Sequence, residues 1–284
     1  MEKDQPLVPR RSVLRVAAAL SGAAVLGGLL ATERSGMPER AAPGGRPGAA
    51  PPARGPEAAA RPQQASAYRL QPMTAQAPLA RRALPPVRTR PLLELPGEGR
   101  TMVLTFDDGP DPRYTPAVLE TLRAHGVPAM FFVCGEMARY HPDLLREMAD
   151  GGHLIGNHTW SHPLVPGLAP SAIRRELGRT SDIVEKTVGA APRWYRAPYG
   201  AWNKHSFEIG AELGMEPLAW TVDTLDWTEP GTGTIVRRVM DGAAPGVVVL
   251  SHDAGGDRSQ SVAALRRYLP RLVDAGYRIT VPRV

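Results

Sequence analysis

Apolar and polar positions alternate in blocks over residues 99–284, where short runs of β-forming residues are separated by amphipathic stretches. The runs predict strands at 101–106, 128–133, 153–156, 193–196, 216–222, 247–250 and 277–281. The amphipathic stretches predict helices at 114–124, 142–150, 170–188, 204–213, 234–243 and 259–275. Strand–helix alternation predicts a parallel sheet, and this region is shorter than the ~250 residues of a full eight-fold barrel. We therefore predict an α/β fold, a reduced or distorted (β/α) barrel with about seven parallel strands.

The first 32 residues have the pattern of an export signal. Arg10 and Arg11 precede the apolar stretch 16–31, as in a charged region followed by a short hydrophobic one. The arginine pair with Leu14 resembles a twin-arginine signal, which we favour over an ordinary secretory signal. Because no clean cleavage site is visible, a membrane tether through 12–32 stays open. We expect an exported protein, extracellular or cell-wall associated, with an uncleaved anchor as the alternative.

Residues 33–98 are predicted to be a disordered linker. They contain 13 of the chain's 30 prolines, mixed with alanine, glycine and arginine. Such a segment cannot bury enough apolar surface to fold and is expected to be semi-extended. The folded domain is therefore assigned to 99–284.

Charge and cysteine content exclude several kinds of protein. The net charge is +6, but residues 33–100 hold 11 Arg and 5 Glu, whereas 101–284 hold 19 basic and 21 acidic residues. The basic charge thus lies outside the predicted domain, which argues against nucleic-acid binding. Cys134 is the only cysteine, so an intrachain disulfide and a four-cysteine zinc site are excluded. We interpret it as a buried structural thiol.

Polar side chains gather where the predicted strands end. In chain order they are Asp107 and Asp108, His158 and His162, Arg196, Asp223 and Asp226, and His252. The carboxyl ends of parallel strands share one edge of the sheet, the face where α/β proteins bind ligands and react. We therefore expect these side chains to meet.

Two of these groups predict a metal site. Asp107 and Asp108 repel each other, and a bound cation would offset that repulsion. Taken alone, Asp-Asp-Gly-Pro is also good turn chemistry. His158 and His162 are spaced so that both imidazoles can face one point. Together with one aspartate they form a set used by zinc hydrolases and non-haem iron oxygenases.

Five segments, in this order, resemble the motifs of polysaccharide deacetylases, the NodB-homology or carbohydrate esterase family 4. They are Thr105-Phe-Asp-Asp-Gly109, His158-Thr-Trp-Ser-His162, Arg196-Ala-Pro-Tyr-Gly200, Asp223-Thr-Leu-Asp-Trp227 and Leu250-Ser-His252. The resemblance covers about 101–284 and does not extend to the first hundred residues.

The resemblance implies roles for the first group of residues. Asp108, His158 and His162 hold a metal ion. Asp107 is the general base for the water that the metal activates. The Arg196 guanidinium orients Asp107 and keeps it ionised.

It also implies roles for the second group. The backbone N–H of Tyr199 stabilises the oxyanion together with the metal. Asp226 pairs with His252, which protonates the departing amine. Trp227 and Leu250 form the walls of the acetyl pocket.

The expected function is hydrolysis of N-acetyl groups on N-acetylglucosamine units of a polysaccharide, either cell-wall peptidoglycan or a chitin-like polymer. Two alternatives are an O-acetyl esterase acting at the same site and a non-catalytic glycan-binding wall protein. The expected cofactor is one divalent ion, Zn²⁺ in the first place, with Co²⁺, Ni²⁺ or Mn²⁺ as alternatives. We expect a monomer that binds an N-acetylated polysaccharide.

Overall fold

The computed structural model describes residues 83–95 and 99–282, which belong to one compact unit, Pro72–Val284. The predicted export signal, and the predicted linker up to residue 82, lie outside the described residues. Among the helices of 83–95 and 99–282, none combines the length and apolarity needed to cross a membrane.

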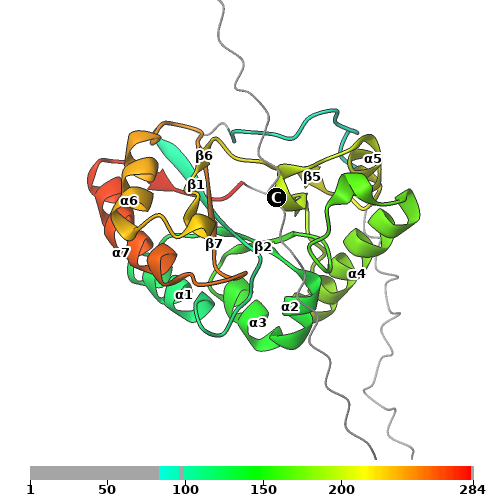
Figure 1. Ribbon diagram of the computed structural model, residues 1–284, viewed down its shortest axis with the longest axis horizontal. Coiled ribbons are helices and arrows are strands. Elements are labelled where there is room, and N and C mark those ends of the chain that lie inside the picture. Colours follow the sequence, from blue (N-terminus) through cyan, green and yellow to red (C-terminus); the bar gives the residue numbers. More distant parts are fainter. Residues whose placement is uncertain (1–82, 96–98, 283–284) are drawn as a thin grey trace, which may run out of the picture. The chain divides into compact units, whose positions relative to one another are not determined.

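A parallel sheet of short strands forms the centre of the described unit (Figure 1). Its hydrogen-bonded order is β5-β4-β3-β2-β1-β7-β6, and β8 pairs separately with β1. The strands are β1 (Thr101–Asp107), β2 (Met130–Val133), β3 (Leu154–Asn157), β4 (Trp194–Tyr195), β5 (Glu216–Pro217), β6 (Val222–Asp223), β7 (Val248–His252) and β8 (Arg278–Ile279). The sheet curls into a distorted (β/α) barrel, which confirms the predicted fold class.

One predicted strand proved to be two. The apolar run 216–222 divides into β5 and β6, which lie at opposite ends of the sheet order. The N–H of Leu218 donates to the carbonyl oxygen of Tyr195 in β4, whereas the N–H of Thr221 donates to the carbonyl oxygen of Val248 in β7. The chain therefore passes from one edge of the sheet to the other within a few residues, so the run is not a continuous strand.

Six helices lie where the sequence predicts them, at α1 (Thr115–Ala124), α3 (Pro142–Asp150), α4 (Pro170–Val188), α5 (Lys204–Glu212), α6 (Thr232–Asp241) and α7 (Ser259–Asp274). A further short helix, α2 (Gly135–Tyr140), was not predicted. Figure 1 shows α6 and α7 beside β6 and β7, and α4 and α5 on the opposite side beside β5. Local signals mark several ends: Asn203 and Ser206 form a capping box before α5, and Gly189 ends α4 with φ 80°.

Alternate residues of β1 serve two different cores. Met102, Leu104 and Phe106 pack into the large core that also holds buried residues of α1, α3, α6 and α7. Val103 packs with residues of β2 and β7 in a smaller core on the opposite face. Because side chains alternate along a strand, Asp107 shares its face with Val103 and points away from the helices. This places the first aspartate inside the curl of the sheet.

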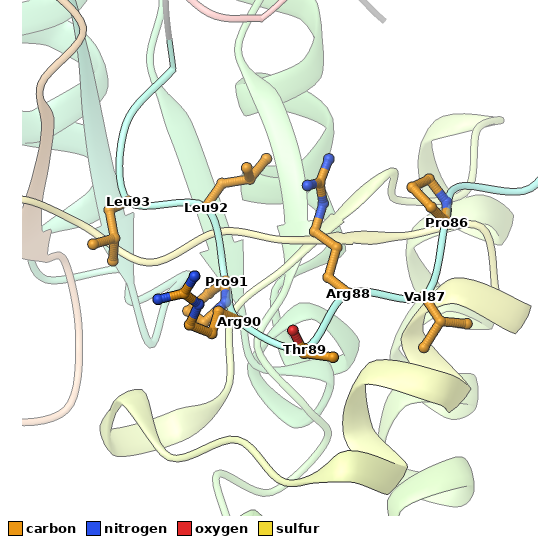
Figure 2. Close-up of a pocket in the computed structure, with 8 residues that line it drawn as sticks. All are labelled: Pro86, Val87, Arg88, Thr89, Arg90, Pro91, Leu92 and Leu93. Carbon is orange, nitrogen blue, oxygen red and sulfur yellow. The ribbon is translucent and has the colours of Figure 1, made fainter.

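A strap formed by residues 83–95 lies against the sheet, although its composition predicts that it belongs to the linker. Leu92 donates its N–H to Pro217 and accepts from the N–H of Ala219, and Leu95 donates its N–H to Gly246. Leu92 and Leu95 also pack on the smaller core. Figure 2 shows residues 86–93 of this strap around a surface pocket. The strap forms backbone hydrogen bonds with β5 and with Gly246, which lies just before β7. The folded unit therefore begins before the predicted boundary at residue 99.

Candidate active site

Most of the predicted site residues line one cavity of about 740 Å³ at the carboxyl ends of the strands. The predicted residues that line it are Asp107, Asp108, His158, His162, Tyr199, Trp227, Leu250 and His252. The other two, Arg196 and Asp226, lie behind the wall and contact Asp107 and His252. The structure thus brings together all ten residues, which come from five separate segments of the chain at or just after the ends of strands.

The three predicted metal ligands converge. Asp108, His158 and His162 each offer one ligand atom, and these atoms lie within 4.8 Å of one another. Asp108 Oδ1 is 3.4 Å from His158 Nε2 and 3.2 Å from His162 Nε2. Ligands bound at ~2.0–2.1 Å in a tetrahedron stand roughly 3.4 Å apart, so the spacing suits zinc.

The protonation pattern also fits a cation. Asp108 Oδ1 is buried and has no hydrogen-bond partner within the described residues. His158 Nδ1 lies 2.8 Å from the Arg196 carbonyl oxygen, so Nδ1 carries the proton and Nε2 keeps its lone pair for a metal. Burial opposes the charge of Asp108, but the charges of the imidazoles around it, His158 first, lower its pKa to about 2. Burial, and then His158, lowers the pKa of His162, which favours the neutral form that binds metals.

Asp107 and Asp108 diverge because the chain leaves β1 between them. Asp108 has φ 77°, in the left-handed region, so the two carboxylates do not simply alternate as in a strand. Asp107 Oδ1 accepts from Arg196 Nη1 over 2.6 Å, while Oδ2 lies 3.7 Å from His158 Nε2. Arg196 is completely buried, and burial lowers its pKa against the opposing effect of Asp107. Asp107 therefore has one oxygen held and one directed towards the ligand set.

Asp226 and His252 form a second pair, in which Asp226 is buried and His252 is partly exposed. His252 Nδ1 is 2.7 Å from Asp226 Oδ1, and the His252 backbone N–H donates to Oδ2. Ser261, near the start of α7, also donates to Oδ2. Burial opposes the charge of His252, but the hydrogen bond and charge of Asp226 raise its pKa to about 9. The imidazole is thus protonated at neutral pH.

Two aromatic residues on the cavity wall are open to solvent. Tyr199 is 68% exposed and Trp227 is 57% exposed, whereas Leu250 is buried. The Tyr199 ring meets His162 edge-on, with 4.7 Å between ring centroids, and its backbone has φ 60°. Asp223, expected only to support a loop, accepts from the Leu225 N–H over 2.8 Å. The exposed rings leave flat apolar surface beside the ligand set.

Sequence reasoning missed several residues around the site. Trp160 and Trp220 also line the cavity, and nothing in their local pattern distinguishes them from core aromatics. Asp253, which directly follows His252, is completely buried. It stands beside a predicted site residue in the sequence, but no role was predicted for it. Glu176, on α4, binds the backbone of the loop that carries both histidines. Its only signal was its place on a helix that follows the histidine loop.

Comparison with known proteins gives the family. The family model described as polysaccharide deacetylase matches residues 95–218. A chitooligosaccharide deacetylase of Rhizobium leguminosarum bv. trifolii is 36% identical over 198 residues, which are 66% of this chain and 92% of that protein. The solved Bc1960 peptidoglycan N-acetylglucosamine deacetylase is 35% identical, with a TM-score of 0.65 over 66% of this chain and 89% of its own.

One further solved relative bears on catalysis. A pseudoenzyme of the CE4 family from Bacillus anthracis, BA3943, is 28% identical with a TM-score of 0.63, covering 67% of this chain and 66% of its own. The residues that the family model matches include Asp107, Asp108, His158, His162 and Tyr199, which line the cavity. The predicted family is confirmed. This chain belongs to the polysaccharide deacetylase family.

Proposed function

We propose that this protein hydrolyses the N-acetyl groups of N-acetylglucosamine units in a polysaccharide. The observation that carries the proposal is the cavity in which a candidate ligand set, a carboxylate held by Arg196 and an imidazole paired with Asp226 face one space. Relatives that act on peptidoglycan and on chitooligosaccharides support the substrate class. Both candidate glycans carry the same acetamido group.

Asp108, His158 and His162 would hold one divalent ion, with Zn²⁺ as the first candidate. Such an ion, when bound, makes a water molecule more acidic and polarises the acetyl carbonyl. Two histidines and one carboxylate would also accept Co²⁺, Ni²⁺ or Mn²⁺.

Asp107 is the proposed general base. Its Oδ1 is held by Arg196, so Oδ2, 3.7 Å from His158 Nε2, is the oxygen free to take the proton of an attacking water. The Tyr199 backbone N–H is the proposed donor to the tetrahedral oxyanion, since Tyr199 lies on the cavity wall beside His162.

His252 is the proposed general acid. Because Nδ1 is bound to Asp226, Nε2 is the nitrogen left to donate a proton into the cavity. An amine leaves a tetrahedral intermediate only when it is protonated, and a histidine with a raised pKa carries that proton at neutral pH. This supports amide hydrolysis over the O-acetyl esterase alternative, because an alkoxide needs the proton less.

Acetate release by the full chain tests the proposal. We expect release from N-acetylglucosamine oligomers or peptidoglycan, loss with a chelator, and recovery on adding Zn²⁺. Asp107→Asn, which keeps the shape but not the base, is expected to lower kcat by about 10²–10⁴-fold. Faster release from acetylxylan than from every N-acetylated glycan would favour the esterase.

The non-catalytic alternative predicts glycan binding without turnover. The similarity to a solved pseudoenzyme is the observation that favours this alternative. The presence of Asp107 and His252, the proposed base and acid, in the cavity lining argues against it. Retention on peptidoglycan with no acetate release at any metal concentration would favour it.

Export is proposed on the sequence alone. A reporter fused after residue 32 should be exported, and Arg10→Lys with Arg11→Lys should block export if the twin-arginine route is used. Export that is unchanged in the double variant would favour the ordinary secretory route or an uncleaved anchor.

A further inference from the structure

The loop that carries the two candidate histidine ligands adopts an unusual backbone. Thr159 has φ 68° and His162 has φ 58°, and neither is glycine. Non-glycine residues in the left-handed region store strain and persist only where their surroundings hold them. The direction of both imidazoles therefore depends on contacts that fix residues 158–162.

Neighbouring backbone and one asparagine hold part of this loop. The carbonyl oxygens of Thr159 and Trp160 accept from the first two N–H groups of α2, over 2.9 and 3.1 Å. The Thr159 N–H donates to Asn157 Oδ1 over 2.8 Å. Asn157 in turn donates to the Leu177 carbonyl of α4. These contacts leave the N–H groups of Trp160 and Ser161 to be satisfied.

Glu176 of α4 satisfies both. Its Oε2 accepts from the Trp160 N–H over 2.9 Å and from the Ser161 N–H over 2.8 Å, and its Oε1 accepts from the Ser161 hydroxyl over 3.1 Å. A single carboxylate thus binds the middle of the loop, between the two histidines, with three hydrogen bonds. Hydrogen bonds to an ionised acceptor are about twice as strong as neutral ones.

We propose that Glu176 is a positioning residue of the metal site, which fixes the separation and direction of His158 and His162 from behind the loop. It touches neither the candidate ion nor the cavity. The packing behind the loop supports a rigid arrangement, because the Arg179 guanidinium lies 3.8 Å from the Trp160 ring centroid and a side chain on Gly135 would meet both Trp160 and Thr180. This inference rests on the proposed metal site.

Substitution of Glu176 is therefore expected to act on metal affinity. Partners that orient metal-binding histidines typically contribute 10–100-fold to affinity. Glu176→Ala removes all three hydrogen bonds, so we expect the Zn²⁺ dissociation constant to rise by about 10–100-fold. Glu176→Gln keeps an oxygen for the backbone but loses the charge, so its dissociation constant should lie between that of Glu176→Ala and the unchanged protein.

The experiment measures Zn²⁺ affinity of the full chain by competition with a chelator, with circular dichroism and thermal unfolding recorded for each variant. Glu185→Ala is the matched control, because Glu185 lies on the same helix and is exposed. It should bind Zn²⁺ like the unchanged protein. At saturating Zn²⁺, acetate release by Glu176→Gln should return towards the unchanged rate.

The outcomes separate the two proposals. If the unchanged protein does not bind Zn²⁺ or any of the other candidate ions, the proposed metal site fails. If it binds and both Glu176 variants bind within twofold of it, the positioning role of Glu176 is overturned. If Glu176→Ala does not fold, Glu176→Gln is used alone, and a Zn²⁺ dissociation constant within twofold of that of the unchanged protein overturns the proposal.

Discussion

The Arg196 guanidinium donates from Nη1 to Asp107 Oδ1 over 2.6 Å, and both side chains are buried. The same guanidinium donates to the Thr105 hydroxyl and to the carbonyl oxygens of Leu218 and Ala219. Its planar fork therefore ties the candidate base on β1 to the turn that joins the two edges of the sheet. An amine on a flexible chain cannot reproduce this pattern.

Arg196→Lys is expected to lose both activity and stability. Lysine can reach Asp107 or the carbonyl groups but not all of them, so Asp107 is left partly unpaired. Truncation of one partner of a buried ion pair costs about 3–5 kcal/mol, and Arg196→Met should approach that loss. We expect kcat to fall by about 10²-fold or more, as for a displaced general base. Acetate release and urea unfolding measure the two effects.

Arg113→Lys is the matched control for this prediction. Arg113 pairs with Asp111 at 2.7 Å, but its side chain is largely exposed, and such pairs contribute about 0–1 kcal/mol. Arg113→Lys should therefore change neither the rate of acetate release nor the free energy of unfolding by more than a small amount. Equal effects of the two lysine substitutions would contradict the assignment.

The Asp226–His252 pair predicts the alkaline limb of the pH profile. Asp226 raises the pKa of His252, so the acid is protonated, and active, below that pKa. Asp226→Asn removes the charge, lowers the pKa of His252 and should move the alkaline limb of kcat/KM to lower pH. A profile between pH 6 and 10 measures this. An alkaline limb that stays in place while kcat falls would show that His252 is not the titrating acid.

The fold was predictable where the pattern was regular. Helices α3 and α4 have the predicted bounds, because each begins with proline and buries one face. The division of 216–222 into β5 and β6 was not predictable, since a run of apolar residues does not reveal which strands it pairs with. The strap was not predicted because its composition resembles that of a linker. Leu92 and Leu95 are held in place only by contacts with residues distant in the sequence.

The convergence of the candidate site residues was predictable where each residue follows the end of a strand. Asp108, His158 and His162 could be grouped because strand ends meet at one edge, and the structure brings them within 4.8 Å. The residues behind them could not be grouped in this way. Glu176 acts on backbone N–H groups, and Gly255 acts by having no side chain, so neither leaves a pattern of donors or charges in the sequence.

Gly255→Ala is expected to weaken metal binding. A Cβ on Gly255 would lie 2.6 Å from Asp108 Oδ2, and φ is 78°, a conformation that side chains rarely adopt. Either Asp108 or the loop must move, so we expect weaker Zn²⁺ binding in calorimetric titration. Gly178→Ala is the control: it lies in α4 with open space around it and should bind normally and be slightly more stable. Equal Zn²⁺ affinity of Gly255→Ala and the unchanged protein would contradict this prediction.

Removal of the strap is expected to destabilise the domain. A chain that starts at residue 99 loses the backbone hydrogen bonds of Leu92 and Leu95 and exposes the smaller core on which they pack. A chain that starts at residue 83 keeps them. We expect the shorter chain to have a lower Tm by several degrees or more, since each ~1 kcal/mol corresponds to about 2–4 °C at this size. Equal Tm values would mean that the strap contributes nothing to stability.

Asp253 predicts a pH-dependent loss of stability in the metal-free protein. It is completely buried, accepts from the Thr115 hydroxyl over 2.5 Å, and burial raises its pKa to about 7 from 3.8. The folded state therefore binds more protons than the unfolded state between these values, so stability falls as pH rises through this window.

Asp253→Asn is neutral throughout, so its stability relative to the unchanged protein should rise between pH 5 and pH 8 by on the order of 2 kcal/mol. Urea unfolding in chelator measures the difference, with the exposed Asp150→Asn as a control that should show no such trend. A relative stability that is the same at both pH values would contradict the raised pKa of Asp253.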